Sequence, residues 1–195
     1  MQITPTDFPG LAVITPKVHR DGRGFFLETY RREIFQAANL PWDFVQTNHA
    51  RAEKTGVLRG LHFQVPPAAQ AKLVWVTAGE ALDVVVDLRR GSPTFGRHFA
   101  IRLTADSFTR LLVPRGFAHG YLTLTPGVEF QYMVDAYYAP EHEQGLRWDD
   151  PDLGVEWPLA APVLADRDRA WPSLKDLDSP FVFAPENEAV FSGPK

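Results

Sequence analysis

Short apolar runs separated by turn residues dominate the chain from Ala71 onward. Six runs have the length and the β-branched or aromatic content of strands, and clusters of Gly, Pro, Asp or Ser interrupt them. These turn residues favour close strand pairing over helices. The spacing predicts an all-β fold, as a sandwich, jelly roll or barrel. The predicted strands are Lys72–Thr77, Ala81–Leu88, His98–Leu103, Arg110–Val113, Phe117–Leu124 and Val128–Val134.

Two segments carry helical signals. In Arg31–Asn39 three apolar residues fall on one helical face, and Pro41 is expected to end the helix. A second, shorter helix is predicted near Ser173–Leu177. After Trp157 the chain becomes Pro-rich and loop-like.

Composition narrows the class of protein. With 195 residues, 45% hydrophobic and 23% charged, the chain has the length and balance of one globular domain. We expect a single domain over 1–195, with a core jelly roll over about 16–157 and a C-terminal extension of loops and short helices over 158–195. The N-terminus lacks a signal-peptide pattern and no apolar run could span a bilayer. A cytoplasmic protein without a membrane partner is therefore expected.

Charge and cysteine content exclude several kinds of partner and site. The formal net charge of -4 argues against a nucleic-acid partner held by a basic surface. Because the chain has no cysteine, disulfides, thiolate metal sites and a cysteine nucleophile are excluded. Any phosphate binding must come from a local cluster of basic residues.

The segment Gly56-Val-Leu-Arg-Gly-Leu-His-Phe-Gln64 sets Arg59 and His62 three residues apart, beside turn-forming glycines. Arginine offers a planar fork of donors suited to phosphate oxygens. Histidine can act as a general base near neutral pH. The combination favours anion recognition beside proton transfer. The alternative is a plain strand that carries a histidine with satisfied hydrogen bonds.

Strand alternation indicates which side chains share a cavity. Phe130, Tyr132 and Val134 fall on one face of their strand, so an inward face places a phenol among apolar residues. Lys72 likewise shares a face with two valines, and a buried ammonium needs a partner anion or a ligand. The alternatives are a core aromatic whose hydroxyl bonds the backbone and a lysine that extends from a strand end to solvent.

The segment Pro114-Arg-Gly-Phe-Ala-His119 matches the P-x-G-x-x-H spacing of the second cupin motif. In metal-binding cupins this motif supplies one histidine ligand, and the first motif supplies two more. Here the first motif offers only His62, followed by Phe63 and Gln64. Since a stable site needs three or more protein ligands, we expect no metal, and His119 is interpreted as a substrate donor or a structural residue.

Ordered motifs along most of the chain resemble those of the dTDP-4-dehydrorhamnose 3,5-epimerase family, which acts on sugar nucleotides. The resemblance spans about Pro16 to Asp168. The chain also shows no dinucleotide fingerprint. The matching segments are Asp21-Gly-Arg-Gly-Phe-Phe-Leu-Glu28, Gln46-Thr-Asn48, Gly56 to Gln64, Ala71-Lys-Leu-Val74, Pro114 to Gly120, Tyr132, Tyr137-Tyr-Ala-Pro140 and Trp148 to Trp157.

The resemblance implies a cupin-type jelly roll that works without metal or nicotinamide. It implies that the substrate is a dTDP-4-keto-6-deoxyhexose, epimerised at C3 and C5 by proton abstraction next to the C4 ketone and reprotonation on the opposite face. It also implies a homodimer in which strands of one subunit extend the sheet of the other.

Site residues follow from the same resemblance. The family's base falls on His62, its acid on Tyr132, its orienting carboxylate on Asp168 and its enolate-facing lysine on Lys72. Tyr138 matches the aromatic that stacks on thymine. Positions that hold nucleotide, diphosphate and sugar fall on Arg23, Phe26, Glu28, Gln46, Thr47, Asn48, Arg59, Lys72, His119, Glu143 and Arg167.

Two positions depart from the family pattern, and three competing functions stay open. Arg167 stands where the family usually has lysine, and Ala50 where it has a serine or similar residue. A relative that epimerises only C3 or only C5 would use the same side chains. The second competing function is that of a metal-dependent cupin, and the third is sugar-nucleotide binding without catalysis.

Overall fold

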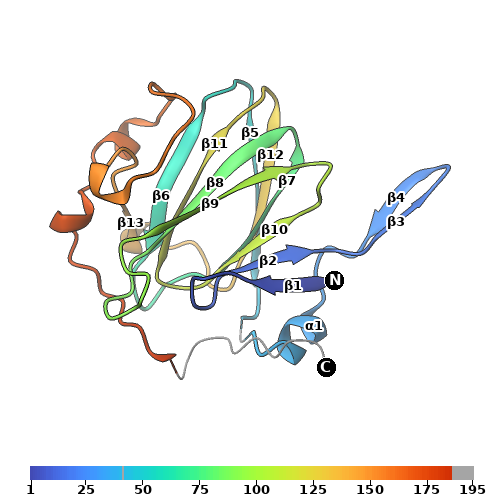
Figure 1. Cartoon of the computed structure of the whole chain (residues 1–195), viewed down its shortest axis with the longest axis horizontal. Coiled ribbons are helices and arrows are strands. Elements are labelled where there is room, and N and C mark those ends of the chain that lie inside the picture. The colour runs from blue at the N-terminus through green and yellow to red at the C-terminus, as the bar shows by residue number, and fades with distance from the viewer. Residues whose placement is uncertain (41, 186–195) are drawn as a thin grey trace.

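In the computed structural model, which describes residues 1–40 and 42–185, two antiparallel sheets pack face to face as a sandwich (Figure 1). The larger sheet has the order β1-β2-β10-β7-β12-β5, formed by β1 (Gln2–Pro5), β2 (Ala12–Thr15), β10 (Arg110–Val113), β7 (Lys72–Ala78), β12 (Val128–Val134) and β5 (Gln46–Ala52). The second has the order β13-β6-β11-β8-β9, formed by β13 (Glu143–Gly145), β6 (Leu58–Gln64), β11 (Phe117–Thr123), β8 (Glu80–Asp87) and β9 (His98–Thr104).

A separate hairpin and a few short helices complete the described residues. Strands β3 (Val18–Asp21) and β4 (Gly24–Leu27) form a two-stranded ribbon that projects from the sandwich (Figure 1). Within residues 1–40 and 42–185, no helix has the length and apolar character needed to cross a bilayer. The helices are α1 (Arg32–Ala37) and the 3₁₀ turns η1 (Pro140–His142), η2 (Pro151–Leu153), η3 (Asp166–Arg169) and η4 (Leu174–Asp176).

The all-β prediction is confirmed. Each of the six predicted strands is present with bounds that differ by at most one residue. The helix predicted over Arg31–Asn39 spans Arg32–Ala37, and Asn39 follows it with a φ of 56°. Pro41, which was expected to end that helix, lies outside the described residues, as do residues 186–195 of the C-terminal extension. The short helix near Ser173–Leu177 is the 3₁₀ turn η4.

An inner strand of each sheet, β7 in the larger and β8 in the second, is largely buried on both faces, because one face meets the opposite sheet and the other is covered from outside. In β7, Val74 and Val76 join the core between the sheets, whereas Leu73 and Trp75 pack outward against α1 and its neighbours. In β8, Val85 faces the same inner core. The outward-facing residues of β8 pack against apolar residues of the C-terminal segment 153–181.

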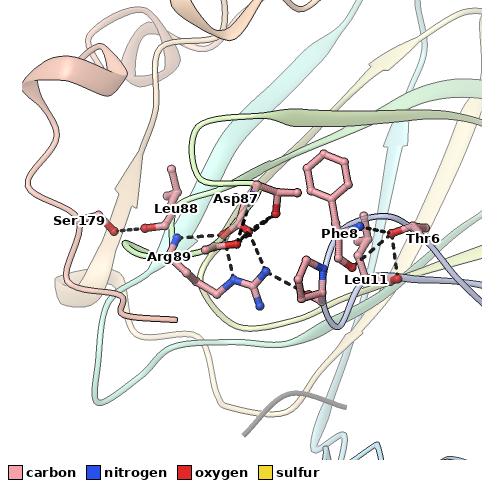
Figure 2. A network of polar contacts seen from close by, with 10 residues as sticks. Thr6, Phe8, Leu11, Asp87, Leu88, Arg89 and Ser179 are labelled. Atoms are coloured by element: carbon pink, nitrogen blue, oxygen red, sulfur yellow. Dashed lines mark hydrogen bonds and ion pairs between the residues drawn. The ribbon is translucent and has the colours of Figure 1, made fainter. Parts of the chain in front are cut away.

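A buried polar network joins three distant segments at the end of β8 (Figure 2). Arg89 Nε donates to Asp87 Oδ1 at 2.9 Å, and Arg89 Nη2 donates both to Asp87 Oδ2 at 2.8 Å and to the carbonyl of Pro9 at 3.0 Å. Ser179 Oγ donates to the carbonyl of Leu88 at 2.5 Å. The network therefore ties the N-terminal loop and the C-terminal segment to the second sheet.

Candidate active site

A cavity of about 550 Å³ opens at one side of the sandwich and collects most of the predicted site residues. Its walls come from both sheets and from residues 163–168. Eleven of the predicted residues line it. They are Gln46, Asn48, Arg59, His62, Lys72, His119, Tyr132, Tyr138, Glu143, Arg167 and Asp168.

His62 and Asp168 form a close pair at the cavity wall. His62 lies on β6, and its Nε2 is 2.6 Å from Oδ1 of Asp168 in η3. Burial alone would raise the pKa of Asp168, but the hydrogen bond and charge of His62 hold that pKa below its usual value. A carboxylate there fixes the ring orientation and leaves Nδ1 as the ring nitrogen available for proton transfer.

Gly60 allows β6 to lie close against β11 next to this pair. Its φ is +129°, and a Cβ at this position would lie 2.5 Å from Cα of Gly120 on β11. Only glycine therefore fits this contact between the two strands. The Gly60 N–H also donates to Asp168 Oδ2 at 3.4 Å, so the carboxylate bridges two positions of β6.

Lys72 lies on β7, in the sheet that faces His62. Its side chain is buried, and Nζ donates to the carbonyl of His62 at 3.5 Å. Burial lowers the pKa of Lys72 to about 8, while the carboxylates of Asp83 and Glu143 oppose that decrease. Because one long hydrogen bond and two carboxylate charges only partly offset the cost of burial, this ammonium is suited to binding an anionic or carbonyl oxygen.

His119 has its own carboxylate partner. It pairs with His62 across the β6–β11 ladder, so both imidazoles lie side by side. Nε2 of His119 is 2.9 Å from Oδ2 of Asp83 on β8, which is fully buried. Among the residues the structure describes, Oδ1 of Asp83 has no hydrogen-bond partner. The cavity thus holds two histidines, each backed by a carboxylate.

Tyr132 enters the cavity from the larger sheet. It lies on β12 and pairs with Val74 of β7 and Asn48 of β5. Burial raises the pKa of the Tyr132 phenol, and the charge of Glu143 adds to that increase. The phenol therefore stays protonated at neutral pH. Because His62 belongs to the opposite sheet, the two side chains border the cavity from opposite sides.

The other predicted residues at the cavity are linked to one another. Glu143 Oε2 accepts from the Tyr138 hydroxyl at 3.0 Å and from Arg167 Nη1 at 2.8 Å. Gln46 Nε2 donates to Asn48 Oδ1 at 2.9 Å, and Gln46 Oε1 accepts from the Tyr138 N–H at 3.1 Å. The half-exposed ring of Tyr138 therefore lies among side chains that can donate and accept hydrogen bonds.

Four predicted residues are not brought to this cavity within one chain. Arg23 and Phe26 lie on the β3–β4 ribbon, where the Arg23 side chain is 91% exposed and pairs with Asp21. Glu28 accepts from Arg31 Nε at 2.9 Å. Thr47 is exposed on β5, since alternation turns it away from the face of its neighbours Gln46 and Asn48.

Two residues next to the site were not predicted from the sequence. Asp83 is an acidic residue in a strand of apolar neighbours, on the inward face with Ala81 and Val85. That alternation was a usable signal. Trp171 packs against the backbone of Gly145, where a Cβ would lie 2.5 Å from the indole, and its ring centroid is 6.2 Å from that of His62. No local pattern marks Trp171.

Over the described ranges, no group of three or more His, Cys, Asp or Glu side chains is placed to hold a metal ion.

Residues 5–176 match a family model described as dTDP-4-dehydrorhamnose 3,5-epimerase. A protein of that name from Pseudomonas aeruginosa is 46% identical over 180 residues, covering 91% of this chain and 98% of the relative.

Solved structures with the same fold include two with bound sugar nucleotides. The dTDP-6-deoxy-D-glucose-3,5-epimerase of Legionella pneumophila, in complex with dTDP-4-keto-L-rhamnose, has a TM-score of 0.89 at 39% identity and covers 94% of this chain and 99% of its own. A 3'-monoepimerase of Streptomyces bikiniensis, in complex with dTDP-quinovose, has a TM-score of 0.82 at 38% identity and covers 88% and 87%.

Proposed function

The chain belongs to the dTDP-4-dehydrorhamnose 3,5-epimerase family, and on that premise we propose how its cavity performs the reaction. The enzyme converts dTDP-4-dehydro-6-deoxy-D-glucose to dTDP-4-dehydro-L-rhamnose. The observation that carries the mechanism is the His62–Asp168 pair, 2.6 Å apart, in one cavity with Lys72 and Tyr132.

His62 is the base. C3 and C5 of the substrate are both next to the C4 ketone, so removal of either proton leaves an enolate with its charge on the C4 oxygen. Nδ1 of His62 accepts the proton, because Nε2 is held by Asp168. The carboxylate stabilises the imidazolium that forms. General-base assistance of this kind contributes about 10²- to 10⁴-fold to the rate.

Lys72 stabilises the enolate. Its ammonium is buried and weakly compensated, so a developing oxyanion gains more from it than in water. The same burial makes the bound ketone easier to polarise. Lys72 therefore stabilises negative charge that appears only as the proton leaves.

Tyr132 returns a proton to the opposite face of the sugar. The phenol is held protonated by burial, and it belongs to the sheet that faces His62. A sugar ring between the two sheets therefore has the base on one face and the acid on the other. Deprotonation by His62 followed by protonation from Tyr132 inverts the carbon, and a proton exchange with solvent resets both groups.

The remaining cavity residues hold the substrate. Arg59 supplies a donor fork for the diphosphate, and Tyr138 stacks on the thymine. His119 faces the sugar beside His62. Precise placement of the reacting carbons supplies much of the remaining rate increase. The other holding residues are Gln46, Asn48, Glu143 and Arg167.

The β3–β4 ribbon acts on a second copy of the chain. The ribbon that carries Arg23 and Phe26 projects from the sandwich (Figure 1), and neither residue lines the cavity of its own chain. Their exposure, which is 91% for the Arg23 side chain and 73% for Phe26, is expected if they complete the nucleotide site of a partner. A homodimer with exchanged strands brings Arg23 and Arg59 to one diphosphate, and Glu28 to its rim.

The decisive experiment is NMR of the 4-keto-6-deoxyglucose nucleotide incubated with the protein in D₂O. We expect deuterium at both C3 and C5, and a product that a 4-ketoreductase converts to L-rhamnose nucleotide. Saturable nucleotide binding without any deuterium incorporation would contradict the proposal and favour a binding module.

A single-site epimerase is the second candidate. It is favoured by the 3'-monoepimerase among the solved structures, which is 38% identical to this chain. The same D₂O experiment separates the two, because deuterium at only one carbon identifies the single-site enzyme.

A further inference from the structure

The β3–β4 ribbon carries Arg23 and Phe26 but has little support of its own. It pairs with neither main sheet, and an isolated two-stranded hairpin is marginally stable in water. Within it Arg20 pairs with Phe25, and His19 pairs with Phe26. Because neighbouring residues point to opposite faces, Phe25 and Phe26 lie on different faces of the ribbon.

One face of the ribbon rests on Phe108, which lies between β9 and β10. The ring of Phe108 is 4.7 Å from that of Phe25, centroid to centroid. The Arg20 guanidinium carbon is 5.4 Å from the centroid of Phe108 and 5.9 Å from that of Phe25. The cross-strand pair and Phe108 therefore form one stacked cluster of two rings and a cation. Phe26, on the other face, stays 73% exposed.

The backbone of Phe108 is held in a conformation that phenylalanine disfavours. Its φ is +55°, in the left-handed region, where a side chain crowds the backbone. The turn before it is fixed by side-chain hydrogen bonds, among them Ser107 Oγ to the Thr104 carbonyl at 3.0 Å and the Thr109 N–H to Ser107 Oγ at 3.2 Å. Glycine would adopt this φ without strain. A phenylalanine here thus indicates that the ring itself is needed.

We propose that Phe108 is a positioning residue for nucleotide binding: it supports the Arg20–Phe25 face of the ribbon so that Phe26 and Arg23 are presented to the sugar nucleotide. This inference rests on the proposed function, in which those two residues contact the nucleotide. Phe108 itself does not line the cavity that contains the proposed base and acid. Its loss therefore weakens substrate binding and leaves the proton transfers unchanged.

The test compares three variants of the full chain. Phe108→Gly removes the ring and relaxes the backbone, so the fold is retained. Phe108→Tyr keeps the ring. Asn39→Gly is the matched control, because Asn39 is the other described non-glycine residue with a positive φ, at 56°, and lies at the end of α1. The measurements are KM and kcat, the Kd for dTDP by calorimetry, and amide hydrogen exchange of residues 18–27.

For Phe108→Gly we expect KM and the dTDP Kd to rise by about 2- to 10-fold, which is the ratio expected for loss of one aromatic contact. We expect kcat to stay unchanged and the ribbon amides to exchange faster. Phe108→Tyr and Asn39→Gly should match the wild type in all four readouts.

Two results would overturn the inference. One is unchanged dTDP affinity and ribbon exchange in Phe108→Gly. The other is a loss confined to kcat, which would place Phe108 in the chemistry. Failure of the proposed function is seen separately, as a wild type that binds dTDP but incorporates no deuterium, and the dTDP Kd of the variants then still decides the inference.

Discussion

Asp83 and Asp87 lie four residues apart on β8, on the same inward face, and both are fully buried. Their surroundings differ completely. Asp87 Oδ1 accepts from the N–H and Nε of Arg89, and Oδ2 accepts from Arg89, Ser92 and Thr94. Asp83 has His119 on Oδ2, and on Oδ1 no partner within the described part of the chain.

This difference separates a structural cluster from a functional one. Buried polar groups are normally paired, and each unpaired one costs free energy. The Asp87 cluster is saturated and connects three segments, as a structural clamp should. The charge of Asp83 acts on Lys72, whose ammonium is also poorly compensated, and its partner His119 lines the candidate site.

The largest expected effect is a loss of catalysis on substitution of His62. His62→Ala removes the proposed base, so deuterium incorporation at C3 and C5 should fall by about 10²- to 10⁴-fold. The dTDP affinity should stay close to wild type, because His62 is not among the residues proposed to hold the nucleotide. Rates of exchange from NMR in D₂O measure the effect. Retained exchange at either carbon would mean that another group is the base for that carbon.

The next largest effect is on folding stability, through the Asp87 cluster. Arg89→Met leaves Asp87 buried without its cation, and removal of one partner of a buried ion pair costs about 3 to 5 kcal/mol of unfolding free energy. Urea unfolding measures this loss, and kcat of the folded fraction should be unchanged. Arg147→Met is the matched control, since its exposed pair with Asp149 should have little effect on the unfolding midpoint. Equal losses of unfolding free energy in the two variants would show that the Asp87 cluster does not stabilise the fold more than an exposed ion pair does.

Lys72→Met should lower the activity and raise the stability of the protein. Removing the ammonium from the enolate should lower kcat by about 10²- to 10³-fold. Since the folded protein no longer buries a poorly compensated charge, the unfolding free energy at pH 7 should rise by roughly 1 to 3 kcal/mol. Kinetics and urea unfolding of the same preparation test both. A variant that is both inactive and less stable would mean that Lys72 is a structural residue.

The pH dependence of the wild type should show the same opposition. Burial lowers the pKa of Lys72 from 10.5 to about 8 in the folded protein. Between these values the unfolded chain binds more protons, so Lys72 contributes increasing stability as pH rises from about 8 to about 10.5. Activity should instead fall through about pH 8 as the ammonium is lost. Both trends should be absent from Lys72→Met.

The smallest expected effect is a shift of the pH–rate profile on substitution of Asp83. Asp83→Asn keeps the shape and a partner for His119 but removes the negative charge that opposes the pKa decrease of Lys72. The alkaline loss of activity should therefore shift to lower pH, by about half to one pH unit. A pH–rate profile of kcat/KM measures it. An unshifted profile would show that Asp83 does not support the charge of Lys72.

The fold was predictable where apolar alternation and turn residues coincide. Strands β7 to β12 follow this pattern because each buries apolar side chains, and their bounds were predicted closely. Strand β5 was missed, since Gln46, Asn48 and Ala50 line a polar cavity and give no apolar alternation. Strands β1 to β4 were also missed, because each has only four residues and two form an exposed ribbon.

The site was predictable where motif residues share the cavity of one chain. His62, Lys72, Tyr132 and Asp168 meet there although Asp168 is distant in sequence. Arg23 and Phe26 do not meet them, because the direction of the ribbon depends on tertiary packing that no local motif encodes. The unpaired oxygen of Asp83 is likewise a property of its neighbours in space.

The placement of base and acid on facing sheets has a consequence for engineering. Sheets in a sandwich pack about 10 Å apart, and this spacing is set by core residues such as Val74, Val85 and Leu111, none of which lines the cavity. We expect the core to limit how thick a substrate can be. Directed evolution towards ketones bulkier than one pyranose ring should therefore select substitutions in the core, at positions that do not line the cavity themselves.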